Sequence, residues 1–229
     1  VTQIDAVFLS HLDSDHSMGI LELLNDMPVE GVYVSAMEAV DVQMQEQLQE
    51  IVEKKQISLY TMKHGDMIRS EAFGEMKCLF PIYVDQTAES ENERSLVLRY
   101  VYGDTSVLFT GDLEAKQESL LERNNLIEET DILKVSHHGS KTASTESFLQ
   151  ALTPETAVIS CGTNNLYGHP HKEVLERLSA CGAEILRTDE MGSVVVNIPP
   201  EGTAEVTAAA ERKPIYERIK EAMEGTPIP

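Results

Sequence analysis

The feature that most limits the possible folds of this 229-residue chain is the alternation of short apolar runs with segments of helical periodicity. Apolar runs of strand length predict β-strands near residues 4–10, 31–35, 57–60, 66–69, 75–80, 95–102, 105–110, 131–136, 156–160, 184–187 and 193–198. Between them, apolar residues recur at helical spacing in residues 17–26, 38–54, 113–124 and 171–181. Strands that alternate with helices are typical of an α/β protein built in layers.

Two local patterns refine this interpretation. Residues 96–112, LVLRYVYGDTSVLFTGD, have alternating apolar positions on both sides of Gly103-Asp104, which predicts a β-hairpin. Residues 199–212 are rich in Pro, Gly, Ala and Thr and predict a linker, after which Ile215, Ile219 and Met223 predict a short amphipathic helix. We therefore expect one domain over residues 1–198, followed by a linker and C-terminal helix over residues 199–229.

The charge balance limits the partners that the surface can attract. The chain has 18 Lys and Arg against 39 Asp and Glu, a formal net charge of −21. Such a surface repels nucleic acid at long range, so a polyanionic substrate would need local attraction. No apolar segment approaches the roughly 18 residues of a membrane span, and residues 1–13 lack the basic region of a signal peptide. We expect the chain as given to be soluble.

The histidines are clustered behind predicted strands. Of the 7 histidines, most fall into three pairs, which are His11/His16, His137/His138 and His169/His171. Loops at the carboxyl ends of strands carry the chemistry of many α/β folds, because the strand fixes the loop while its side chains stay free to converge. We expect the pairs to meet, with His169 in the site and His171 at the start of the following helix.

The densest cluster is SHLDSDH, residues 10–16. Its imidazoles and carboxylates would each lose several kcal/mol of hydration if they were buried without partners. A divalent cation removes that penalty, since imidazole nitrogen and carboxylate oxygen are ligands of Zn, Mn and Fe. The alternative is an acidic turn in which Asp15 caps the next helix.

This stretch is similar to the HxHxDH signature of the metallo-β-lactamase superfamily, with Asp13 in place of the second histidine. With TGD, SHHGS and YGHP downstream, it resembles the C-terminal metallo-β-lactamase domain of the ComEC/Rec2 family of competence DNA-uptake proteins. The matching pieces occur in the family's order over about residues 4–198; they are IDAVFLSHLDSDHSMG, NERSLVLRYVYGDTSVLFTGDLE, DILKVSHHGS, SCGTNNLYGHPHKEVLERL and LRTDEMGSVVV.

The resemblance implies a four-layer αββα sandwich. Because the family's first strands precede the metal motif by several tens of residues, we expect this chain to lack part of the N-terminal half. The strand near residues 4–10 would then lie near an exposed sheet edge.

The resemblance also implies two divalent metal ions. It assigns His11 and Asp13 to the first site, Asp15 and His16 to the second, Asp112 as the bridging ligand and His137 as the last ligand of the second site. The family's third histidine of the first site has no counterpart, and Asn92 stands there instead. A first site poor in nitrogen slightly favours Mn²⁺ over Zn²⁺.

Further roles follow from the same motifs. Asp15 would orient or accept a proton from a metal-activated hydroxide, and His138 or His169 would protonate the leaving oxygen. Residues assigned to substrate binding are Asn92, Ser140, Lys141, Asn164 and Tyr167.

The favoured function is a nuclease, a metal-dependent phosphodiesterase acting on DNA. The alternatives are a hydrolase of a small phosphoester or amide, and a non-catalytic assembly module. The expected partners are DNA and the membrane-channel part of a longer parent chain, which would hold this domain at the cell membrane, on the extracytoplasmic rather than the cytoplasmic face.

Overall fold

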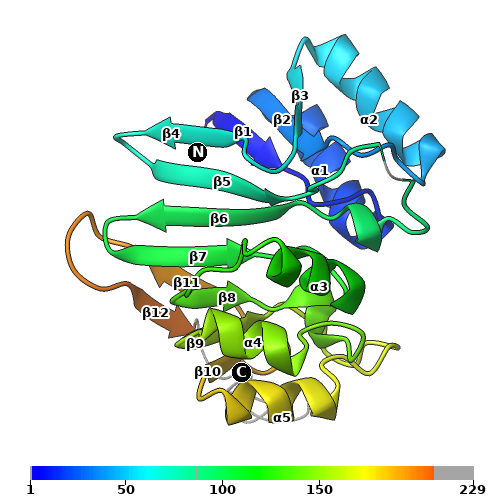
Figure 1. Cartoon of the computed structure of the whole chain (residues 1–229). Coiled ribbons are helices and arrows are strands. Elements are labelled where there is room, and N and C mark those ends of the chain that lie inside the picture. Colours follow the sequence, from blue (N-terminus) through cyan, green and yellow to red (C-terminus); the bar gives the residue numbers. More distant parts are fainter. Residues whose placement is uncertain (1, 86, 209–229) are drawn as a thin grey trace, which may run out of the picture.

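The computed structural model describes residues 2–85 and 87–208. Its largest sheet has seven strands in the order β10-β9-β8-β7-β6-β5-β4 (Figure 1). These strands are β4 (Met67–Ser70), β5 (Gly74–Phe80), β6 (Val97–Tyr102), β7 (Thr105–Phe109), β8 (Ile132–Lys134), β9 (Thr156–Ile159) and β10 (Glu184–Arg187). Strands β4 to β7 are antiparallel, whereas β7 to β10 are parallel.

A second sheet is parallel and has the order β1-β2-β3. Its strands are β1 (Ile4–Phe8), β2 (Val29–Ser35) and β3 (Ser58–Met62), connected by helices α1 (Ser14–Asp26) and α2 (Val42–Lys55). Among the described strands, β1 pairs with β2 alone, which confirms the expected sheet edge at this strand.

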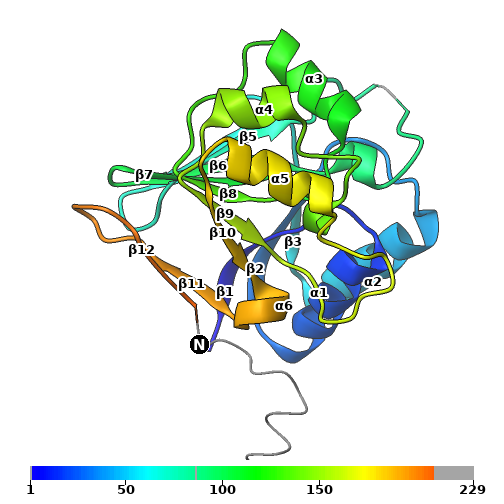
Figure 2. The ribbon, with the colours of Figure 1, turned by 90° about the horizontal axis from the view of Figure 1, so that it is seen from below.

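The layers follow the αββα order (Figure 2). Helices α3 (Ala115–Arg123), α4 (Glu146–Leu152) and α5 (Lys172–Ala180) cover one face of the large sheet, while α1 and α2 lie outside the small one. Each boundary between layers has its own apolar cluster, and the one between the two sheets is small, with buried side chains from Met62, Cys78, Leu96 and Leu98. The expected fold class is therefore confirmed.

The predicted strands are all present, and so is the β6–β7 hairpin around Gly103-Asp104. Three elements were missed, namely α4, α6 (Thr188–Met191) and β12 (Glu205–Ala208), and α4 and α6 are too short to show a clear helical period. Strand β12 pairs with β11 (Val194–Asn197), so the segment expected to be a linker contains half of a hairpin. The C-terminal amphipathic helix lies outside the described residues.

The topology brings together the loops that carry the histidines. Because β7, β8 and β9 are parallel, their carboxyl ends lie at one edge of the large sheet, with Asp112 following β7 and His137 following β8. The backbone N–H of Leu96 donates to Ser10 O at 2.8 Å, which fixes the loop after β1 against this edge.

In the part of the chain that the structure describes, every helix is too short or too polar to traverse a lipid bilayer.

Candidate metal centre

The loop after β1 places the first group of ligands at the start of α1. Asp13 is the N-cap residue, and its carbonyl oxygen accepts the N–H groups of His16 and Ser17, each at 2.9 Å. The Asp13 side chain makes no capping hydrogen bond, and Asp15 lies inside the first turn. The carboxylates of this motif are therefore not used to cap the helix, contrary to the alternative interpretation of the sequence.

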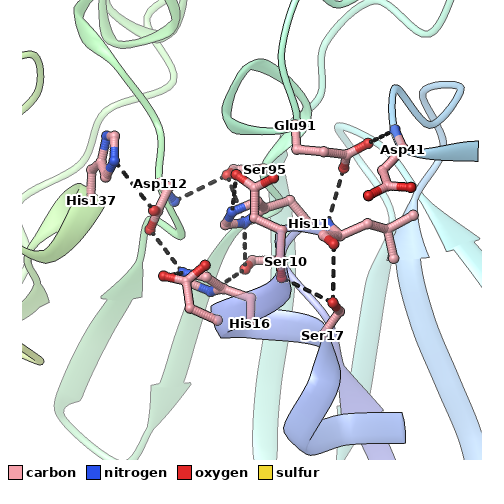
Figure 3. Close-up of polar contacts among 12 residues, drawn as sticks. Ser10, His11, His16, Ser17, Asp41, Glu91, Ser95, Asp112 and His137 are labelled. Atoms are coloured by element: carbon pink, nitrogen blue, oxygen red, sulfur yellow. Dashed lines mark hydrogen bonds and ion pairs between the residues drawn. The ribbon is translucent and has the colours of Figure 1, made fainter. Parts of the chain in front are cut away.

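Asp112 is held where the two sheets approach one another. Gly111 precedes it with φ +53°, and a Cβ atom on Gly111 would lie 2.9 Å from Ser10 Cβ and 3.0 Å from Ser95 Cβ. The Asp112 N–H donates to Ser95 Oγ at 3.0 Å (Figure 3). Glycine is required here because the backbone is left-handed and has no room for a side chain.

The loop after β8 carries two adjacent histidines in an uncommon conformation. His137 and His138 both have positive φ, at 47° and 53°, and Gly139 follows with φ 83°. His138 Nδ1 lies 2.7 Å from Ser160 O. Because a carbonyl oxygen only accepts hydrogen bonds, the neutral ring carries its proton on Nδ1 and presents the Nε2 lone pair to the site.

Four side chains from these loops converge. Asp15, His16, Asp112 and His138 each offer one ligand atom, and these atoms all lie within 4.8 Å of one another. His16 Nε2 lies 3.1 Å from His138 Nε2 and 3.2 Å from Asp112 Oδ1, and His138 Nε2 lies 3.3 Å from Asp15 Oδ2. Ligands about 2.1 Å from a tetrahedral ion lie about 3.4 Å apart, so this spacing suits a divalent cation.

His138, rather than His137, belongs to this group. His137 Nε2 lies 3.7 Å from Asp112 Oδ2, and its Nδ1 lies 3.3 Å from Glu114 Oε1. The family resemblance assigned the ligand role to His137 and a proton-transfer role to His138, so the geometry differs from that assignment. Two successive left-handed residues direct their side chains differently from an extended segment, and nothing in the sequence SHHGS shows this.

His11 and Asp13 form a neighbouring pair outside the group of four. His11 Nε2 lies 3.5 Å from Asp13 Oδ2, is buried and makes no hydrogen bond within the described residues. Burial and the nearby His16 lower the pKa of His11 to about 4, so the imidazole is uncharged at neutral pH, as a metal ligand must be. Burial, then the charges of Glu91, Asp15 and Asp112, raise the pKa of Asp13.

Asp112 is the electrostatic centre of the site. Burial alone would raise the pKa of its carboxyl group, but the side chains of His138 and His16 outweigh burial and hold this pKa far below its usual range. In turn, the hydrogen bond to Asp112 raises the pKa of His138. The carboxylate therefore stays ionised at the meeting point of both histidine loops.

The other predicted site residues differ in how close they lie to the four ligands. His169 joins it, with its ring centroid 5.5 Å from that of His137, and Tyr167 stacks on His169 at 5.7 Å. Ser140 Oγ is turned toward Thr142 Oγ1 at 3.0 Å. Lys141 and Asn164 are exposed, and within the described residues neither side chain forms a hydrogen bond or ion pair with the four ligands. Asn92 Oδ1 is buried and makes no hydrogen bond in the same part of the chain.

Three supporting residues were missed. Glu114 contacts His137, Ser95 binds Asp112, and Glu91 Oε2 accepts the N–H of Leu12 at 2.9 Å. Glu114 follows Asp112 by two positions and was within reach of sequence reasoning. Glu91 and Ser95 lie in a polar segment without periodicity, where no signal marks them.

Comparisons with known proteins agree with this architecture. The family model of the Metallo-beta-lactamase superfamily matches residues 84–163. ComE operon protein 3 of Bacillus subtilis is 33% identical over 219 residues, which cover 90% of this chain and 27% of that protein. Competence protein ComA of Neisseria gonorrhoeae is 33% identical over 196 residues, covering 85% of this chain and 25% of that protein.

Recombination protein 2 of Haemophilus influenzae is 36% identical over 130 residues, covering 57% of this chain and 16% of that protein. The chain thus spans about a quarter or less of the length of these relatives. Among solved structures, a CmlA beta-hydroxylase E377D mutant superimposes with a TM-score of 0.54 at 12% identity, over 82% of this chain and 43% of the other, which supports the fold alone.

Proposed function

Because the chain belongs to the metallo-β-lactamase superfamily, we propose that it binds two divalent metal ions, Mn or Zn with Mn slightly favoured, and hydrolyses phosphodiester bonds of DNA. The observation that carries this proposal is the convergence of Asp15, His16, Asp112 and His138. The Nε2 atoms of His16 and His138 face each other at 3.1 Å, an arrangement that a cation between them explains.

The donor set fits metal ions in a second way. His11 Nε2 is buried and makes no hydrogen bond within the described residues, and the buried Asp112 Oδ1 lies 3.2 Å from His16 Nε2. Buried polar atoms of this kind need a partner, and a metal ion supplies one. We assign His11 and Asp13 to one ion and Asp15, His16 and His138 to the other, with Asp112 between them.

The chemistry follows from these positions. A bound divalent ion supplies a Lewis acid that lowers the pKa of the attacking water and stabilises the charge that develops on the phosphoryl group. Asp15 accepts a proton from that water, since its carboxylate is more than half exposed and borders His138. His169 donates a proton to the leaving oxygen, since its ring centroid lies 5.5 Å from that of His137 and 6.5 Å from that of His138.

DNA is proposed as the substrate because one of the relatives is named as a competence protein and another as a recombination protein. The charge of −21 opposes broad electrostatic capture of a polyanion. We assign local phosphate contacts to Ser140 and Lys141, which follow His138, and to Asn92 and Asn164. The remaining part of a longer parent chain would supply a membrane channel, with this domain on the extracytoplasmic face.

The test joins metal analysis to a cleavage assay. The purified protein should retain close to two metal ions per chain and cleave labelled single- or double-stranded DNA with Mn²⁺. Asp112→Asn should lower both metal content and cleavage, the latter by about a hundredfold or more. Asp104→Asn, at the exposed turn of the β6–β7 hairpin, is the matched control and should change neither.

The ligand assignment has its own test in the same assay. His138→Ala should lose more bound metal than His137→Ala, and the reverse order would restore the assignment implied by the family motif. Cleavage of a chromogenic phosphoester but not of DNA would favour a small-molecule hydrolase. Absence of retained metal would favour a non-catalytic assembly module.

A further inference from the structure

A cleft of about 410 Å³ opens directly beside the four converging ligands. It is lined by Asp15 and His138 of the centre and by Asn165, Tyr167 and His169 of the loop between β9 and α5. This volume lies within the range of about 300–1,000 Å³ that is usual for small-ligand sites. A group bound in the cleft would therefore contact the metal centre and the loop between β9 and α5 at once.

Three rings in this cleft are nearly parallel. His138 and His169 have centroids 6.5 Å apart with an interplanar angle of 18°, and His169 and Tyr167 have centroids 5.7 Å apart with an angle of 24°. The series leads from the metal ligands outward to Tyr167, which is 79% exposed. Among the aromatic side chains that the structure describes, Tyr167 is the most exposed.

The loop that carries these rings is braced from within. The His169 N–H donates to Asn165 Oδ1 at 2.9 Å, and Asn165 Nδ2 donates to His169 O at 2.6 Å and to Gly162 O at 2.9 Å. These bonds hold the backbone around Tyr167 in place without using its ring. Because the ring also stacks on His169, a ligand that binds Tyr167 meets a partly ordered side chain, which reduces the entropy lost on binding.

We propose that Tyr167 is a stacking platform for an unpaired nucleobase, and that it selects single-stranded nucleic acid for the metal centre. This inference rests on the proposed phosphodiesterase function. Every nucleobase has a flat face that can stack on an aromatic ring, and stacking is independent of the charge that disfavours phosphate binding here. Bases in a duplex are already paired and stacked, so only a strand that has been separated presents a free face.

The test compares two oligonucleotides with the same phosphates, a fluorescent ten-residue oligothymidylate and an abasic strand of equal length. Binding is followed by fluorescence anisotropy in EDTA at about 0.15 M salt, where surface charges are largely screened beyond roughly 8 Å. The wild-type chain should bind the oligothymidylate about tenfold or more tightly than the abasic strand. Tyr167→Ala should abolish this difference, while Tyr167→Phe, which keeps the ring, should retain it.

Leu166→Ala is the matched control, since Leu166 is fully exposed next to Tyr167 and has no ring. Equal affinity of the wild-type chain for the two strands, no binding of either, or an unchanged preference in Tyr167→Ala would each overturn the inference. The assay needs neither a metal ion nor cleavage. A base preference without cleavage would therefore contradict the proposed function alone, and cleavage without a base preference would contradict the stacking platform alone.

Discussion

Three loops hold the ligands of the candidate centre, and two of them, the loops after β1 and after β8, are each anchored by one buried glutamate. The loop after β1 depends on Glu91, which accepts the N–H groups of Leu12, Val40 and Asp41 and pairs with Arg94 at 2.9 Å. The loop after β8 depends on Glu118 of α3, which accepts the N–H groups of Ser144 and Thr145 at the start of α4. Within the described residues, Glu118 forms no ion pair.

The pKa values of Glu91 and Glu118 are shifted in opposite directions. Burial alone would raise the pKa of Glu91, but hydrogen bonds from Asp41, Arg94 and Leu12 outweigh burial and lower it. For Glu118, burial raises the pKa, and the hydrogen bonds from Thr145 and Ser144 offset only part of this effect. Similar loop anchors can therefore have opposite electrostatic character, depending on whether a cation lies beside the carboxylate.

The largest expected effect is that of Glu91→Gln. Each oxygen of Glu91 accepts two donors, so the amide nitrogen of Gln would face two of them and would leave Arg94 buried without its counter-ion. We expect the free energy of unfolding to fall by about 3–5 kcal/mol. Urea unfolding of the metal-free protein measures this, with the exposed Glu89→Gln as the control. A loss similar to that of the control would show that Glu91 is not an anchor.

Gly111→Ala tests how closely the loop after β7, which carries Asp112, approaches the loop after β1. An alanine would adopt φ +53° and bring its Cβ within 3.0 Å of Ser10 and Ser95. We expect a loss of about 2–3 kcal/mol in unfolding free energy, together with weaker metal retention because Asp112 would move. Gly19→Ala in α1, where no atom lies within 4 Å, should instead be neutral or slightly stabilising. Equal stability of the two variants would contradict the close approach.

Glu118→Gln should have a smaller effect than Glu91→Gln. The amide oxygen keeps one of the two backbone hydrogen bonds, and no buried cation is left without a partner. We expect a loss of about 1–2 kcal/mol, measured in the same way, with the exposed Glu155→Gln as the control. A loss as large as that of Glu91→Gln would remove the contrast between the two anchors.

The pH dependence of these losses should run in opposite directions. Because the pKa of Glu91 is lowered on folding, its stabilising contribution is present above the unfolded value near 4.5 and is lost as the pH falls through the folded value. The pKa of Glu118 is raised, so its contribution is present below 4.5 and is lost as the pH rises through the folded value. The difference between wild type and Glu91→Gln should therefore shrink in acid, and that for Glu118→Gln should shrink toward neutral pH.

The sequence predicted the strands of both sheets because buried strands leave apolar runs that local composition reveals. It did not reveal β12, since Pro, Gly and Thr between residues 199 and 207 indicated a linker although the chain turns back onto β11. The position of His138, rather than His137, in the group of four depends on backbone dihedral angles, and the role of Glu91 depends on contacts with residues 50 or more positions away. Neither property has a local signature.

The apolar cluster between the two sheets is small, so apolar packing contributes little to holding the two sheets together. Among the described residues, the buried members of this cluster are Met62, Cys78, Leu96 and Leu98. The candidate centre takes Asp15 and His16 from the small-sheet side of this boundary and Asp112 and His138 from the large-sheet side. A metal ion bound by all four of these side chains would link the small sheet to the large sheet. Amide protons of β1, β2 and β3 should then exchange with solvent faster than those of the central strands in the metal-free protein, and slow down when metal is added.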